Sequence, residues 1–276
     1  MLPLPAKTPF PSITSSLGFD ARETAQLTPY WTFYWAVAAA QLARWLPRRP
    51  AQVLDISDPR ARCSVQSAAA GHTVIQLLGQ GAGGAAHTPD GAGDGALGKG
   101  QIHSVIADTG SLGFLADGSL DAVIAEDRVL SRHLVTEATV AEIARVLRPG
   151  GRMLLCVDSL VLGMAILAEQ KHWAQLSDVP RAEVVLVPWP NGIITRCFWA
   201  EELRELLLDA GLETEWIRPR TILSPSTVEH VLAAAPRELS RLVRTELATP
   251  IGDESVGIHL VASAVKPAAA GGSGQR

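Results

Sequence analysis

Residues 117–127 read DGSLDAVIAED, and residues 142–155 read EIARVLRPGGRMLL. The apolar run at 121–125 has the length of a buried strand, and a second such run lies at 152–157. Between them, apolar residues recur at helical spacing, which predicts a helix over 136–147. A helix that joins two buried strands is the usual crossover of a parallel pair. These residues therefore predict an α/β fold.

Apolar runs ahead of this unit predict further strands at 51–56, 73–78 and 102–107. After the unit, strands are predicted at 213–217 and 258–265. Another helix is predicted over 200–210, and Gly211 follows it at the position where a C-cap glycine is expected. The alternation of strands and helices predicts a doubly wound, largely parallel sheet with helices on both faces.

One domain is expected, over residues 21–266. Residues 1–20 are predicted to be a flexible N-terminal lead, and 267–276 a disordered tail. Residues 79–100 contain nine glycines and almost no large apolar side chain, which predicts a disordered insert. A glycine-rich phosphate cradle is the alternative, but no strand-GxxxxGK[ST]-helix context surrounds these glycines.

The composition argues against several classes of protein. With 24 basic and 28 acidic residues the net charge is -4, whereas a nucleic-acid-binding face needs an excess of basic residues. The apolar stretch at 31–46 is too short to span a membrane. The histidines show no metal-binding spacing, so no metal site is expected. The cysteines have no paired spacing, which favours the reducing cytoplasm; they are Cys63, Cys156 and Cys197.

The two quoted stretches, together with CFWAEELRELLLDAGLE at 197–213, resemble the class I S-adenosylmethionine-dependent methyltransferases of the small-molecule type. The resemblance implies a Rossmann-like, seven-stranded sheet whose last strand is antiparallel. Segments 213–217 and 258–265 would then be the sixth and seventh strands. The resemblance also implies S-adenosylmethionine as cofactor, bound beyond the carboxyl ends of the strands.

The loop after the first predicted strand departs from the family pattern. The family has an acidic residue and then three alternating glycines, and here Asp55 is followed by Ser57, Pro59 and Ala61. Proline fixes φ near -65° and donates no N–H, and a Cβ at a left-handed position costs roughly 1–2 kcal/mol. This degenerate loop cannot copy the usual glycine conformation, which makes cofactor binding the open question. Within it, Asp55, Ser57 and Asp58 are the candidate cofactor-binding residues.

Two further cofactor contacts are implied after the next strands. The family places a ribose-binding acid at the end of the second strand, where this chain has Leu78, with Gln76 as a nearby polar group. Asp108 follows the third strand, at the position where the family binds the adenine amino group. The alternative for Asp108 is a side chain that caps the following turn.

Three residues are candidates for catalysis. Glu126 and Asp127 follow the fourth strand, where they would orient the substrate or act as a base, although capping of the next helix is equally plausible. His133 is the best-placed histidine for proton abstraction, against the alternative of a packing histidine.

Tryptophans are the candidate substrate-binding residues. Trp31 and Trp35 lie in an aromatic segment before the first strand, and Trp189 lies in a predicted rigid turn after the fifth. They would line an apolar pocket, or else pack a capping helix onto the core.

Two functions follow from these observations. The first is methyl transfer from S-adenosylmethionine to a small, partly apolar molecule. The second is a protein of the methyltransferase fold that has lost cofactor binding and serves as a binding or regulatory partner. A variant of the first function is an enzyme that keeps the methyltransferase fold and its pocket but catalyses another reaction. The sequence makes no prediction of an oligomeric state.

Overall fold

The computed structural model describes residues 28–79, 100–250 and 257–268. The predicted lead at 1–20, nearly all of the insert at 79–100 and most of the tail at 267–276 lie outside the described residues.

The strands form one sheet, which confirms the predicted Rossmann-like fold. Seven of them follow the order β3-β2-β1-β4-β5-β9-β8, with β9 antiparallel to both neighbours. The bounds are β1 (Gln52–Asp55), β2 (Thr73–Leu78), β3 (Gln101–Ile106), β4 (Leu120–Ala125), β5 (Leu147–Ser159), β8 (Glu213–Pro219) and β9 (His259–Val265).

Two more strands, β6 (Val185–Pro188) and β7 (Ile194–Phe198), form a hairpin that the sequence analysis did not predict. The hairpin joins the sheet where β7 runs parallel to the end of β5, at Asp158 and Ser159. Its turn contains Gly192 with φ +84°, a conformation that glycine adopts without steric cost. The sequence analysis passed over both strands, although residues 184–187 read VVLV.

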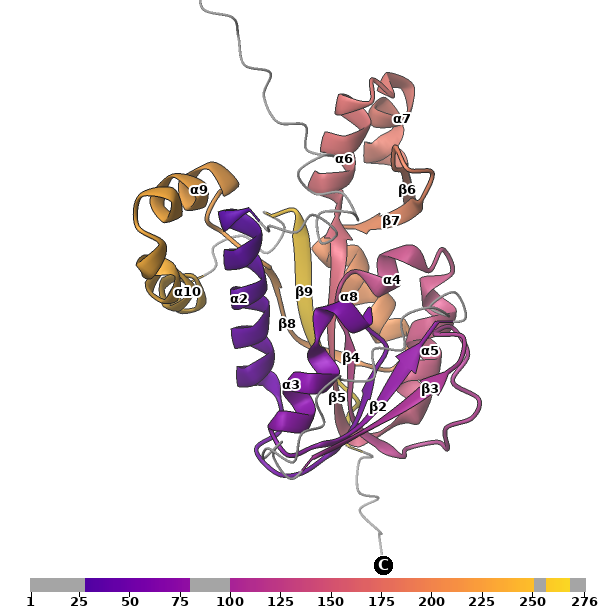
Figure 1. Cartoon of the computed structure of the whole chain (residues 1–276). Coiled ribbons are helices and arrows are strands. Elements are labelled where there is room, and N and C mark those ends of the chain that lie inside the picture. Colours follow the sequence, from indigo (N-terminus) through magenta and orange to yellow (C-terminus); the bar gives the residue numbers. More distant parts are fainter. Residues whose placement is uncertain (1–27, 80–99, 251–256, 269–276) are drawn as a thin grey trace, which may run out of the picture.

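Helices cover both faces of the sheet (Figure 1). The two faces arise because successive side chains of a strand point to opposite sides. One face packs against α2 (Pro29–Trp45) and α3 (Cys63–Ala69). The other packs against α5 (Thr136–Val146) and α8 (Ala200–Asp209). The helix predicted over 136–147 ends one residue earlier, because Leu147 already begins β5.

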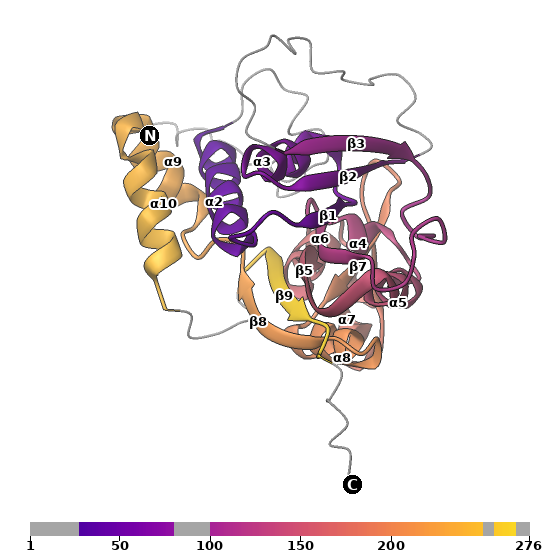
Figure 2. The same cartoon turned by 90° about the horizontal axis from the view of Figure 1, so that it is seen from below.

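A second apolar core lies at the carboxyl ends of the strands. It is built with α6 (Leu160–Glu169), α7 (Trp173–Asp178), α9 (Pro225–Ala234) and α10 (Leu239–Ala248), with short 3₁₀ turns at Val179–Arg181 and Pro236–Glu238. The short helix α4 (Val129–Arg132) belongs to the core that α5 and α8 cover. We call α6, α7, α9, α10 and the β6–β7 hairpin the cap. Helices α9 and α10 lie beside α2 in both views (Figure 1 and Figure 2).

Helix α2 connects the cap with the sheet. It begins after Thr28, whose hydroxyl accepts a hydrogen bond from the backbone N–H of Trp31, and Pro29 occupies its first turn. Its N-terminal half belongs to the core of the cap, and its C-terminal half packs on the sheet. Among the described helices, none combines the length and the hydropathy that crossing a bilayer requires.

Candidate functional site

The loop after β1 is tied to the end of β4 by polar groups. The buried carboxylate of Asp55 accepts hydrogen bonds from the Ser57 backbone N–H (3.0 Å) and the Ser64 hydroxyl (2.5 Å). Burial raises the pKa of Asp55, and these hydrogen bonds oppose the shift. The Ser57 Oγ accepts from the backbone N–H of Glu126 at 2.8 Å. The predicted residues Asp55, Ser57 and Glu126 therefore meet at the switch point between β1 and β4, where open α/β sheets bind ligands.

The same loop closes through a 3₁₀ turn at Pro59–Ala61. The backbone N–H of Ala61 donates to the Asp58 carbonyl at 2.8 Å. The positive φ falls on Arg62 (+59°), just before α3, and not on Ser57, Pro59 or Ala61. The loop thus adopts a shape that these side chains permit.

The turn after β4 is strained. Asp127 and Arg128 have φ values of +57° and +59°, and neither is glycine. Left-handed conformations cost about 1–3 kcal/mol per non-glycine residue and cluster at ligand-binding and catalytic sites. Asp127 also lies 3.7 Å from the Arg132 guanidinium, and the half-buried Asp58 acts on the same guanidinium.

A buried ion pair lies on this turn. The Arg220 guanidinium, from the segment after β8, donates to Oε2 of Glu126 and to the side-chain carbonyl of Gln41 on α2. Arg220 and Glu126 are only 1% and 3% exposed. Glu126 Oε1 and Arg220 Nε have no hydrogen-bond partner among the described residues. Buried polar atoms without partners are rare in folded proteins, so these two mark a place where a polar ligand or water fits.

A second buried polar group lies next to the ion pair. The Tyr34 hydroxyl is 2.9 Å from Nδ1 of His259, and Nε2 of His259 is 3.5 Å from Oδ1 of Asp158. Arg128 also approaches Asp158 at 3.5 Å. Burial lowers the pKa of His259 far below its ordinary value, and the charges of Arg128 and Arg220 lower it further. Burial raises the pKa of Asp158, so a neutral imidazole faces a carboxyl group that protonates more easily than usual.

Sequence analysis missed most of this second group. Asp158 carried a usable signal, because it directly follows a predicted strand, at the end where sites form. Tyr34 belonged to the aromatic segment, but nothing singled it out from its neighbours. Arg220 and His259 had no local signal, since their partners come from segments distant in the sequence.

Asp108 and His133 lie together at the end of β3. Asp108 is exposed, and its Oδ1 accepts from the Gly110 backbone N–H at 3.0 Å, which is the turn-capping geometry. Its other oxygen has no partner among the described residues and can accept from a ligand. His133 is half-buried between the hydroxyls of Thr109 (2.7 Å) and Thr139 (2.8 Å). Burial lowers the pKa of His133, which favours the neutral imidazole. Each of its two ring nitrogens lies within hydrogen-bond distance of one threonine hydroxyl.

The side chain of Gln76 is bonded toward the edge of the sheet. It is half-buried on β2 and accepts a hydrogen bond from the Ser104 hydroxyl of the edge strand β3 at 3.3 Å. In register it pairs with Asp55, before the end of its strand.

The predicted substrate-binding tryptophans belong to the cap. Trp189 does not project from its turn into solvent. It is 3% exposed, and its indole N–H donates to the Thr195 hydroxyl at 2.9 Å. Its burial follows from the hairpin, which folds the turn back onto the apolar core. Trp31 is buried in that core and stacks on Trp35 at 6.5 Å between ring centroids. Their contacts match the packing alternative.

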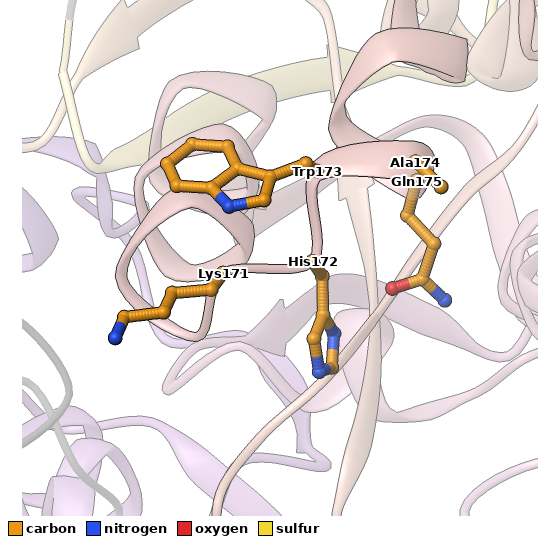
Figure 3. A pocket seen from close by; sticks show the side chains of 5 residues that line it. All are labelled: Lys171, His172, Trp173, Ala174 and Gln175. Carbon is orange, nitrogen blue, oxygen red and sulfur yellow. The ribbon is translucent and has the colours of Figure 1, made fainter.

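A hollow of about 490 Å³ opens elsewhere, where α6 connects to α7. Figure 3 shows the side chains that line it: Lys171, His172, Trp173, Ala174 and Gln175. Residues of the β1–β4 switch point do not contribute to it. Among the described residues, no group of three or more His, Cys, Asp or Glu side chains is arranged to hold a metal ion.

Comparison with known proteins adds family information. Residues 89–155 match the methyltransferase domain family. A comparison with curated proteins finds no matching relative.

Solved structures share the fold. A SAM-dependent methyltransferase from Methanosarcina mazei has 19% identity and a TM-score of 0.53, over 83% of this chain and 98% of that chain. The 1,6-didemethyltoxoflavin-N1-methyltransferase of Burkholderia thailandensis, with bound 1,6-didemethyltoxoflavin and S-adenosylhomocysteine, has 19% identity and a TM-score of 0.52 over 90% and 83%. The cyclase SpnF has 18% identity and a TM-score of 0.52 over 84% and 80%.

At these identities the likeness to solved structures concerns the fold. The strand order and the matched segment point the same way as the motifs quoted at the outset. The chain therefore has the fold of the class I S-adenosylmethionine-dependent methyltransferases and carries a segment of the methyltransferase domain family at residues 89–155.

Proposed function

We propose that this protein transfers the methyl group of S-adenosylmethionine to a small, partly apolar molecule. The observation that carries the proposal is the switch point between β1 and β4. There a strained turn at Asp127 and Arg128, a loop anchored by Asp55, and an unpartnered oxygen of Glu126 come together. Strain and unsatisfied polar groups are costly, and proteins retain them chiefly where function needs them.

The residues present suit the cofactor's polar groups. Asp108 has a free carboxylate oxygen for the adenine amino group, and Gln76 is the nearest polar side chain on β2 for the ribose hydroxyls. Ser57, Asp58 and Glu126 would surround the methionine end. When bound, the cofactor supplies an electrophilic methyl group on a sulfonium, which a correctly aligned acceptor displaces in line.

The chain's own task is to align the acceptor, exclude water and take up a proton. Glu126, Asp127 and His133 are the proposed bases, and Glu126 is the one with an unpartnered carboxylate oxygen. Trp31, Trp35 and Trp189 are the residues proposed to contact an acceptor with apolar surface, which would insert between side chains that pack together in the core of the cap. The Burkholderia thailandensis protein with the same fold binds 1,6-didemethyltoxoflavin in addition to S-adenosylhomocysteine.

We also propose a cytoplasmic location and no nucleic-acid partner. All three cysteines are buried free thiols, which suits a reducing compartment. The net charge of -4 does not favour phosphate contacts.

Isothermal titration with S-adenosylmethionine and S-adenosylhomocysteine tests the proposal. We expect both to bind the parent protein, and Asp108→Ala to weaken binding. Asp209→Ala is the matched control, because Asp209 is an exposed acid at the end of α8, outside the site. No heat with either ligand at millimolar concentration would refute methyl transfer and favour the alternative, a binding or regulatory protein of this fold.

A further inference from the structure

Arg220 comes from outside the segments that build the switch point, yet its side chain ends there. The residue directly follows β8, and its backbone N–H donates to the His259 carbonyl at 2.9 Å. Its side chain has no exposed surface and pairs with Glu126, the first residue after β4. An Arg side chain has about five N–H donors, so complete burial requires hydrogen-bond acceptors in the protein. Glu126 on the turn and Gln41 on α2 supply them here.

The ion pair is tied to the loop after β1. The backbone N–H of Glu126 donates to the Ser57 Oγ at 2.8 Å. Cys63, the first residue of α3, follows the same loop and is 5% exposed, and burial raises the pKa of its thiol. Through Glu126, Arg220 therefore lies where the ends of β1 and β4 meet and where the cofactor of the proposed function would enter.

The segment that carries Arg220 is fastened to the helices around the site. The Thr221 hydroxyl is 3.0 Å from the Tyr30 hydroxyl on α2. The backbone N–H groups of Ile222 and Leu223 donate to the Glu246 carboxylate on α10, at 2.6 and 3.2 Å. Movement of Arg220 is thereby coupled to α2 and α10. We call residues 220–223 the strap.

The ion pair holds the closed arrangement in place. One oxygen of Glu126 and the Nε of Arg220 have no partners among the described residues, so both groups are incompletely satisfied. Withdrawal of one partner from a buried ion pair is costly, because it leaves the other charge uncompensated. The closed arrangement therefore dominates until a ligand supplies contacts to Glu126.

We propose that Arg220 is the gate of the cofactor site, an inference that rests on the proposed function. In the closed form its guanidinium pairs with Glu126 directly after β4 and neutralises that carboxylate. The cofactor enters when the strap withdraws Arg220. A protein whose open form is a minor species binds with an affinity reduced by the open fraction.

The first test compares cofactor affinity in gate variants by isothermal titration. Arg220→Met removes the guanidinium, and Arg220→Gln keeps a donor for Glu126 should the Met variant fold poorly. If the open form is about 1–10% populated, loss of the gate tightens binding of S-adenosylmethionine roughly 10- to 100-fold. The matched control is Arg196→Met, because Arg196 is 4% exposed and pairs with Glu137 and Glu202 away from the switch point. Equal or weaker binding by both gate variants overturns the proposal.

The second test needs no ligand. Alkylation by iodoacetamide is followed at each cysteine by peptide mass spectrometry. Opening of the gate exposes Cys63, whereas Cys197 lies in the core of the cap and reports general unfolding. We expect Cys63 to react at least tenfold faster in Arg220→Met than in the parent, with Cys197 unchanged.

The two tests separate the gate from the proposed function. If neither parent nor variants bind the cofactor, the proposed function fails, and the rate at Cys63 decides whether Arg220 closes the site. Equal rates at Cys63 in parent and variant, or equal acceleration at Cys63 and Cys197, overturn the gate.

Discussion

His259 should make the stability of this protein sensitive to mild acid. Its imidazole is 1% exposed, bonded through Nδ1 to the Tyr34 hydroxyl, and faces Asp158, Arg128 and Arg220. Burial and the two guanidinium groups hold its pKa well below the ordinary value. The unfolded chain therefore takes up a proton at a higher pH than the folded protein does. Stability from the neutral imidazole is complete above the unfolded pKa and is lost as pH falls below it.

The size of the effect follows from the protonation difference. An unfolded histidine titrates near about 6.5, and each pH unit below that costs roughly 1.4 kcal/mol until the folded pKa is reached. Between pH 7.5 and 5.5, His259 alone should thus lower the free energy of unfolding by roughly 1.4 kcal/mol. His72 and His133 have pKa values lowered by burial as well, and they add to the slope in parent and variant alike.

Urea unfolding at pH 5.5, 6.5 and 7.5, followed by tryptophan fluorescence, measures this contribution. His259→Gln keeps a side-chain acceptor for Tyr34 but cannot take up a proton. We expect its unfolding free energy to fall less steeply with pH than that of the parent, by the amount given above. His103→Gln, on the exposed strand β3, should leave the slope unchanged. A parent-like slope in His259→Gln would show that the buried imidazole is not the neutral group inferred here.

Three substitutions test other parts of the structure. Asp108→Ala should weaken S-adenosylmethionine binding roughly 10- to 100-fold, the value of a hydrogen bond to a charged group, and leave urea stability nearly unchanged because the side chain is exposed; an unchanged Kd contradicts its adenine role. Trp189→Ala should cost about 3–5 kcal/mol of unfolding free energy, against less than about 0.5 for the 59%-exposed Trp173→Ala; equal losses would place Trp189 at the surface. Gly163→Ala brings a Cβ to 2.9 Å from the Cys197 sulfur and should cost about 1–3 kcal/mol, with unchanged stability arguing for looser packing of α6 on β7.

The sequence predicted the sheet well because a buried parallel strand leaves a local mark. Several strands of the sheet contain runs of Val, Ile and Leu, as at 121–125 and 152–157, and the helix over 136–147 showed its own period. The β6–β7 hairpin was not predicted, although residues 184–187 read VVLV, as apolar a run as those of the predicted strands. Strand β5 runs to Ser159, two residues past its predicted end, and so carries Asp158 into the site.

The candidate site was predictable only in part. Asp55, Ser57 and Glu126 were singled out in the sequence, and the structure brings them together because each lies at or just after the end of a strand. Trp189 was a candidate for the substrate pocket, and the hairpin places it in the core of the cap. His133 was singled out as a base, and its contacts with Thr109 and Thr139 are those of a residue that joins two segments.

The sequence by itself determined the α/β class and the polar residues at the strand ends, which depend on periodicity and on neighbours within a few residues. The family resemblance implied the seven strands and the antiparallel direction of the last one. Only the tertiary structure decided which charges meet. Arg220 reaches Glu126 across 94 residues of sequence, and Tyr34 reaches His259 across 225. Such pairs leave no local pattern, because their free energy depends on burial and on partners that are adjacent only after the chain has folded.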